Sequence, residues 1–161
     1  MNRFWKGLQW VMESMKTVGA CCLMGMTLLT CADVVGRFFG HPIFGSVELV
    51  GFMAALSVAM ALPYTHQAQG HIGVEILVRL MSERTRKTID LVTNFLALVL
   101  FAVVTWRMAL YARTMKNAGE VSMNLQIPSS WIIGVVAFCF LVFTLGIVQE
   151  VLSALRRRED A

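Results

Sequence analysis

The sequence has 161 residues, of which 57% are apolar, and its mean hydropathy is +0.67. Soluble domains usually contain roughly 45–50% apolar residues, so the composition excludes an ordinary soluble domain. The net charge of +4 and the pI of about 9.1 would by themselves also fit a nucleic-acid-binding protein.

Four long apolar runs account for the high hydropathy, and a membrane-spanning helix needs about 20 such residues. We therefore predict an all-α integral membrane protein that forms one domain over residues 1–161. The transmembrane helices are expected at about 17–35, 47–63, 89–111 and 131–152.

The basic residues are distributed unevenly among the segments outside these runs. Ten lie in the N-terminal arm, the segment 63–88 and the C-terminal tail, while Arg37, Arg113 and Lys116 lie in the other two connections and Arg107 lies inside a run. Because Lys and Arg accumulate on the cytoplasmic side, we expect both termini and the middle segment to be cytoplasmic. The charges then set the topology, and a nucleic-acid-binding patch is not predicted.

The arm before the first run is amphipathic. Apolar residues recur on one helical face, and polar residues occupy the other; the apolar set is Phe4, Leu8, Val11, Met12 and Met15. This spacing predicts an interfacial helix at about 3–16 that lies on the inner membrane surface, with burial against a soluble domain as the alternative. A similar pattern predicts a second cytoplasmic amphipathic helix at about 73–82.

The first connection is rich in turn-forming residues and is flanked by charges. It contains Gly40, Pro42 and Gly45, with Arg37 before them and Glu48 after them, which predicts a short hairpin between two helices. Both charges would lie near the outer membrane surface. An ion pair between Arg37 and Glu48 is one reading, and two separately solvated charges are the other.

The second run carries small residues at every fourth position, namely Gly51, Ala55 and Ala59. Inside a bilayer, small residues allow two helix backbones to approach closely. The spacing therefore predicts a tight helix–helix contact, either internal or with a partner. Pro63 is expected to end this helix.

Few residues are candidates for chemistry. Ionisable groups inside a membrane mark functional sites by default, which singles out Glu48, but its position in the first turn of a helix favours the membrane surface. The four cysteines lie in apolar runs, and no predicted transmembrane helix contains a histidine. No phosphate-binding motif or nucleophile–base arrangement is present. We therefore predict no catalytic, cofactor-binding or metal-binding residues and no enzymatic activity.

Several short motifs in fixed order resemble a known family. The segment Val34-Val35-Gly36-Arg37-Phe38-Phe39 is followed by Pro42, by Glu48-Leu49 and, after an apolar helix, by His71-Ile72-Gly73-Val74, while Ile127-Pro128 precedes the last run. This pattern resembles the small membrane subunit, the DctQ type, of tripartite ATP-independent periplasmic (TRAP) transporters. The resemblance extends over nearly the whole chain.

The resemblance implies a subunit of a sodium-driven importer in the bacterial inner membrane. A periplasmic solute-binding protein would deliver a carboxylate-type solute to a large multi-helix subunit, which would also bind the sodium ions. The small subunit would be surrounded by membrane lipids, pack beside the large one and help to dock the binding protein.

The same resemblance suggests roles for particular residues. Arg37, Pro42, Glu48 and His71 become candidates for hairpin geometry or partner contact, and Gly51, Ala55 and Ala59 for the helix-packing face. Arg37, Arg113 and Lys116 are candidates for docking the binding protein. The alternative function is a self-sufficient four-helix exporter, coupled to protons through Glu48 and acting as a homodimer.

Overall fold

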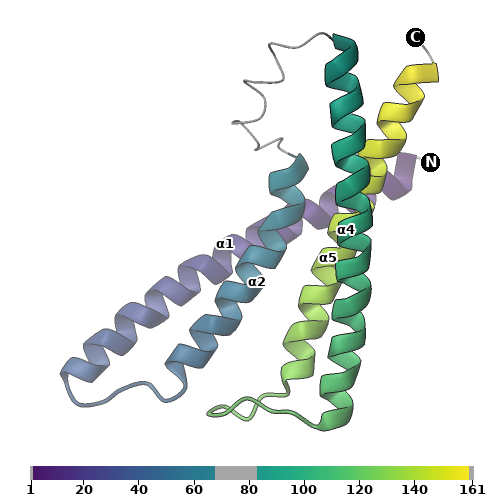
Figure 1. The fold of residues 1–161 in the computed structure, drawn as a ribbon. Helices are drawn as coiled ribbons and strands as arrows, with labels where there is room; N and C mark the ends of the chain where they lie inside the picture. Colours follow the sequence, from purple (N-terminus) through teal and green to yellow (C-terminus); the bar gives the residue numbers. More distant parts are fainter. Residues whose placement is uncertain (1, 68–82, 160–161) are drawn as a thin grey trace.

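The computed structural model describes residues 2–67 and 83–159, and side-chain surroundings are described for residues 5–66, 89 and 92–152. The described residues form four long helices, α1 (Asn2–Phe38), α2 (Ser46–Gln67), α4 (Glu83–Ala118) and α5 (Ser129–Glu159) (Figure 1). Each contains a stretch long and apolar enough to cross a membrane. The predicted all-α fold with four spans is confirmed.

The helices are arranged as two antiparallel hairpins. α1 packs along α2 and α4 packs along α5, and contacts between α2 and α5 join the two pairs. The connections 39–45 and 119–128 lie at one end of the molecule, which we call the loop end (Figure 1). We call the opposite end, where the chain termini lie, the terminal end. The hairpins diverge toward the loop end.

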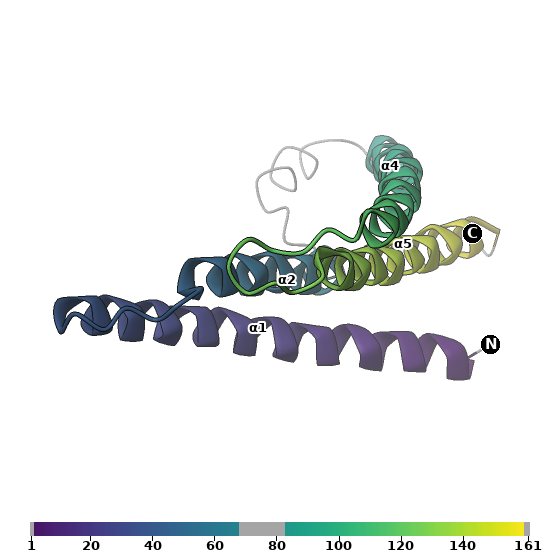
Figure 2. The same cartoon turned by 90° about the horizontal axis from the view of Figure 1, so that it is seen from below.

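α1 is unbroken over 37 residues, whereas the sequence suggested a separate interfacial helix at 3–16. Viewed from the loop end, α1 runs as one straight rod beneath the other helices (Figure 2). The apolar stripe of the arm explains the difference, because Leu8, Met12 and Met15 are buried against α5. The stripe therefore contributes to the core between the helices. The second predicted amphipathic helix, 73–82, lies outside the described residues.

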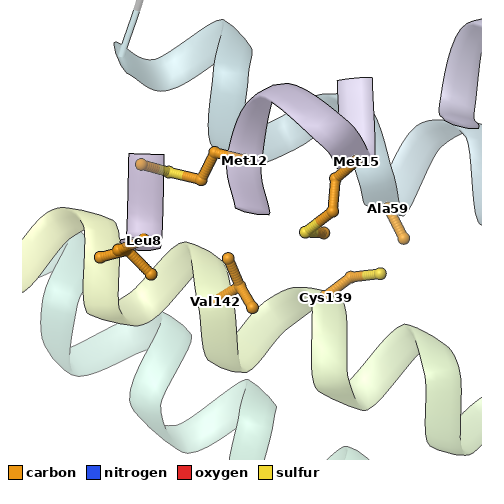
Figure 3. Packing of buried hydrophobic residues seen from close by; sticks show 6 residues of the cluster. All are labelled: Leu8, Met12, Met15, Ala59, Cys139 and Val142. Atoms are coloured by element: carbon orange, nitrogen blue, oxygen red, sulfur yellow. The ribbon is translucent and has the colours of Figure 1, made fainter. Parts of the chain in front are cut away.

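The core is small and lies where α1 crosses α2 and α5 (Figure 3). Its buried members are Leu8, Met12, Met15, Ala59, Cys139 and Val142. Methionine side chains adapt to irregular spaces, and a free thiol behaves as a small apolar group. This set therefore allows three helices to meet at one point.

A glycine on α1 allows a close approach between α1 and α2. A Cβ atom at Gly19 would lie 3.2 Å from the Met60 Cβ and 3.3 Å from the Ser57 carbonyl oxygen. The Ser57 hydroxyl donates a hydrogen bond of 3.0 Å to the Gly19 carbonyl oxygen. Close backbone approach and an interhelical hydrogen bond are the interactions that hold helices together in a bilayer.

α4 and α5 are joined by hydroxyl and aromatic contacts. The Thr105 and Thr144 hydroxyl oxygens are 3.2 Å apart. The Phe101 ring meets the Phe143 ring edge-on at 4.5 Å between centroids and stacks on Phe140 at 6.1 Å. These contacts fix the second hairpin.

The expected end of α2 at Pro63 is wrong, because the helix continues to Gln67. Proline removes one backbone N–H and so one hydrogen bond. In membrane helices this loss is tolerated where neighbouring groups or local adjustment satisfy the freed carbonyl. The Pro63 side chain is fully buried, so packing favours continuation of the helix.

Replacing Gly19 with Leu should lower the thermal stability of the protein in detergent micelles, at a cost of about 1–3 kcal/mol, because the new side chain must displace α2. Gly7→Leu on the same helix is the matched control, since a Cβ at Gly7 meets nothing within 4 Å. Equal melting temperatures for the two variants would contradict this packing.

Candidate functional site

Asp33 organises the first connection at the loop end. Its side chain is buried; one carboxylate oxygen accepts a hydrogen bond of 2.8 Å from Arg37 Nε, and the other accepts one of 2.9 Å from the Ile43 backbone N–H. The connection is further held by a 2.8 Å bond from the His41 N–H to the Gly36 carbonyl. Asp33 thereby ties the end of α1 to the residues that lead into α2.

Glu48 joins the two hairpins. Its carboxylate oxygen Oε2 accepts hydrogen bonds from the backbone N–H groups of Asn124 and Leu125, at 3.1 and 3.0 Å. Glu48 lies in the first turn of α2, where a negative charge also complements the helix dipole. Bonds to an ionised acceptor are stronger than neutral ones. One carboxylate thus links α2 to the connection between α4 and α5.

The connection 119–128 is folded so that these amides point toward α2. Val121 and Pro128 form an isolated antiparallel bridge. The Ser122 N–H donates to the Ile127 carbonyl at 2.9 Å, and the Ile127 N–H donates to the Ser122 hydroxyl at 3.3 Å. The result is a tight turn that reaches from the α4–α5 hairpin to the start of α2 (Figures 1 and 2).

Gly45 allows an apolar contact beside the Glu48 bonds. Its φ is +73°, and a Cβ there would lie 2.7 Å from side-chain carbons of Leu125. A non-glycine residue would be strained by the backbone conformation and would also clash with Leu125. The Leu125 side chain therefore packs on a position that has no side chain of its own.

The proposed Arg37–Glu48 ion pair is not formed. Arg37 binds Asp33, one helical turn before it, and Glu48 binds backbone amides of a distant loop. The i, i+4 spacing of Asp33 and Arg37 was a readable signal for their pairing. No local signal connects Glu48 to residues 76 and 77 positions away.

The other predicted site residues are dispersed. Pro42 lies exposed in the first connection, and His71 lies outside the described residues. Gly51 and Ala55 are exposed on α2, whereas Ala59 is buried in the core against α5. Arg113 and Lys116 lie exposed near the end of α4, on the α4–α5 hairpin.

A polar pair at the terminal end was not anticipated. His66 Nε2 on α2 lies 3.1 Å from Glu150 Oε2 on α5, and the His66 ring meets Phe143 edge-on. Within the described residues, the buried Nε2 has no partner with hydrogen-bond geometry, so its contact with Glu150 is an ion pair only when the imidazole is protonated. A cavity of about 20 Å³, lined by both residues, has room for about one water molecule.

The described residues contain no group of three or more His, Cys, Asp or Glu side chains placed to hold a metal ion. At the loop end, the carboxylates of Asp33 and Glu48 accept hydrogen bonds that hold backbone segments in place.

Glu48→Ala should release the 119–128 connection, because the amides of Asn124 and Leu125 lose their acceptor. Hydrogen exchange of a peptide covering 122–127 should accelerate strongly in this variant and moderately in Glu48→Gln, which keeps an acceptor oxygen. Glu120→Ala, an exposed carboxylate at the base of the same connection, should leave exchange unchanged. Unaltered exchange in Glu48→Ala would show that the bonds do not hold the loop.

A search of curated proteins finds no significant match to this chain. A family model described as "Tripartite ATP-independent periplasmic transporters, DctQ component" matches residues 26–157. The match includes Asp33, Glu48 and the 119–128 connection, and it spans most of the 161 residues. The chain therefore belongs to the DctQ family, the small membrane component of TRAP transporters.

Proposed function

We propose that this DctQ subunit is a non-enzymatic scaffold in a sodium-driven importer of a carboxylate-type solute. It holds the large transport subunit at a fixed position in the bilayer and helps to dock the solute-binding protein. The observation that supports this role most directly is the hydrogen bonding of Glu48. In a protein with few charges inside its spans, this carboxylate binds two backbone amides of another hairpin, and so stabilises one relative placement of the helices.

The large subunit is proposed to contact the exposed small-residue face of α2. A Cβ at Gly51 would meet nothing within 4 Å, and Ala55 is exposed on the same side. Val47 and Val58, which lie on this face, are also largely exposed. Small residues at such a face permit close approach of a partner helix. Ala59, at the deep end of the face, anchors α2 in the core.

The loop end is proposed to face the periplasm and the binding protein. The orientation rests on the excess of basic residues in the termini and in segment 63–88. Exposed apolar side chains at this end, among them Phe44 and Met123 at 76% and 94% exposure, would supply the contact surface. Arg37 is bound by Asp33, so it contributes less free charge to docking than the sequence suggested.

The exporter alternative requires Glu48 to bind and release a proton in each transport cycle. Its carboxylate is instead engaged with two amides near a helix terminus. Such donors stabilise the ionised form, which suits a permanent structural bond better than a proton-coupled site.

Gly51→Leu and Ala55→Leu should reduce copurification of the large subunit with a tagged form of this chain. Both substitutions point away from the described core, so the chain itself should accumulate normally. Ala102→Leu, a small-to-large change at an exposed position of α4, should leave copurification intact. Equal recovery of the large subunit with all three variants would place the contact elsewhere.

Reconstitution in proteoliposomes tests the transport role. With an inward sodium gradient, uptake of an organic acid bound by the binding protein should require this chain, the large subunit and the binding protein together. Proton-driven flux through this chain alone, abolished by Glu48→Gln, would overturn the scaffold proposal in favour of the exporter.

A further inference from the structure

An open groove of about 500 Å³ runs between α4 and α5 at the loop end. α4 contributes Ala112, Arg113 and Lys116, and α5 contributes Ser130, Trp131, Gly134, Val135 and Phe138. Ser130 and Trp131 lie in the first turn of α5, and Lys116 lies in the last turn of α4. The groove therefore begins at the end of both helices and extends down the hairpin.

The polar and apolar groups of the groove are separated by depth. Lys116, the Ser130 hydroxyl and the Trp131 indole lie in the terminal turns of the two helices, and Arg113 lies three residues further into α4. Gly134, Val135 and Phe138 continue down α5, and Phe138 lies about 10 Å along the helix from Trp131, at 1.5 Å per residue. A Cβ at Gly134 meets nothing within 4 Å, so the absent side chain leaves the groove open. Indole rings and long cationic side chains commonly lie at headgroup depth.

The two cations of the groove are available to a ligand. Arg113 and Lys116 form no ion pair within the described part of the chain, whereas Arg37 at the same end is paired with Asp33. They are three residues apart on α4 and thus share one face of the helix. Two unpaired positive charges beside a hydroxyl group match the phosphodiester of a lipid.

We propose that this groove binds an anionic membrane phospholipid, with the phosphate at Arg113 and Lys116 and one acyl chain along Gly134, Val135 and Phe138. A zwitterionic lipid would bring its own ammonium group toward the two cations, so a lipid of net negative charge is preferred. Acidic side chains of a docking protein would meet the cations but would leave the apolar floor empty. The observations therefore favour a lipid over a docking protein for these two residues.

Fluorescence quenching by brominated lipids tests this site in the full chain, reconstituted in phosphatidylcholine nanodiscs. Trp131 is left as the sole tryptophan by Trp5→Phe, Trp10→Phe and Trp106→Phe. Dibrominated phosphatidylglycerol should then quench Trp131 more than dibrominated phosphatidylcholine at equal mole fraction. The local enrichment of phosphatidylglycerol near Trp131 should fall about fivefold for each cation removed, in Arg113→Gln and Lys116→Gln. About fivefold is the contribution expected of one basic residue at an anionic membrane surface.

Three controls separate the site from general membrane contact. Arg107→Gln removes an exposed α4 cation that does not line the groove, and it should preserve the lipid preference. A variant with Trp106 as the sole tryptophan reports an exposed α4 surface outside the groove and should show no preference. Gly134→Leu should reduce quenching of Trp131 by filling the groove without altering its charge.

Equal quenching of Trp131 by the two lipids would overturn the proposal, as would a preference that survives loss of both cations. Loss of quenching when the large subunit is present would show that a protein occupies the groove, and would also overturn it. The transport assays do not depend on this result, so they test the proposed scaffold role separately.

Discussion

The carboxylate of Glu48 connects the two halves of this molecule at the loop end. Four helices in a bilayer gain little from apolar burial against one another, because lipid chains offer an equally apolar surface. The two hairpins share a core near the terminal end and diverge toward the loops. Bonds from Glu48 to the amides of Asn124 and Leu125, with Leu125 packed on Gly45, restrain that divergence. The proposed scaffold role requires this kind of restraint, since the partner would have to meet a fixed surface.

Other polar side chains in the bundle also form hydrogen bonds that hold its parts together. Asp33 satisfies both Arg37 and the Ile43 amide, and Ser57 donates across the α1–α2 contact to Gly19. Each of these two polar side chains thus stabilises backbone or helix packing. The cations Arg113 and Lys116 are different, because they line an open groove and form no ion pair with the residues that the structure describes. That contrast distinguishes the internal contacts from the groove, where we propose that a lipid binds.

The sequence pattern was sufficient to predict the helices but not the contacts between them. Hydropathy placed four spans because a helix satisfies its own backbone within the segment, which makes the signal local. The amphipathic stripe of Leu8, Met12 and Met15 was also visible, yet lipid and protein are equally apolar, so the sequence did not reveal that it faces α5. Likewise, Pro63 carries a strong local signal for a helix end, but burial overrides it and α2 continues.

By itself, the sequence determined a four-span membrane protein of the DctQ type, because run lengths, charge asymmetry and motif order are properties of the linear chain. Only the tertiary structure decided what the rare charges do. Asp33, rather than Glu48, binds Arg37, and Glu48 binds a loop far along the chain. The physical reason is that the partner of a carboxylate is set by which donors come within about 3 Å. For Glu48, that proximity arises only when two hairpins with no shared local pattern are packed together.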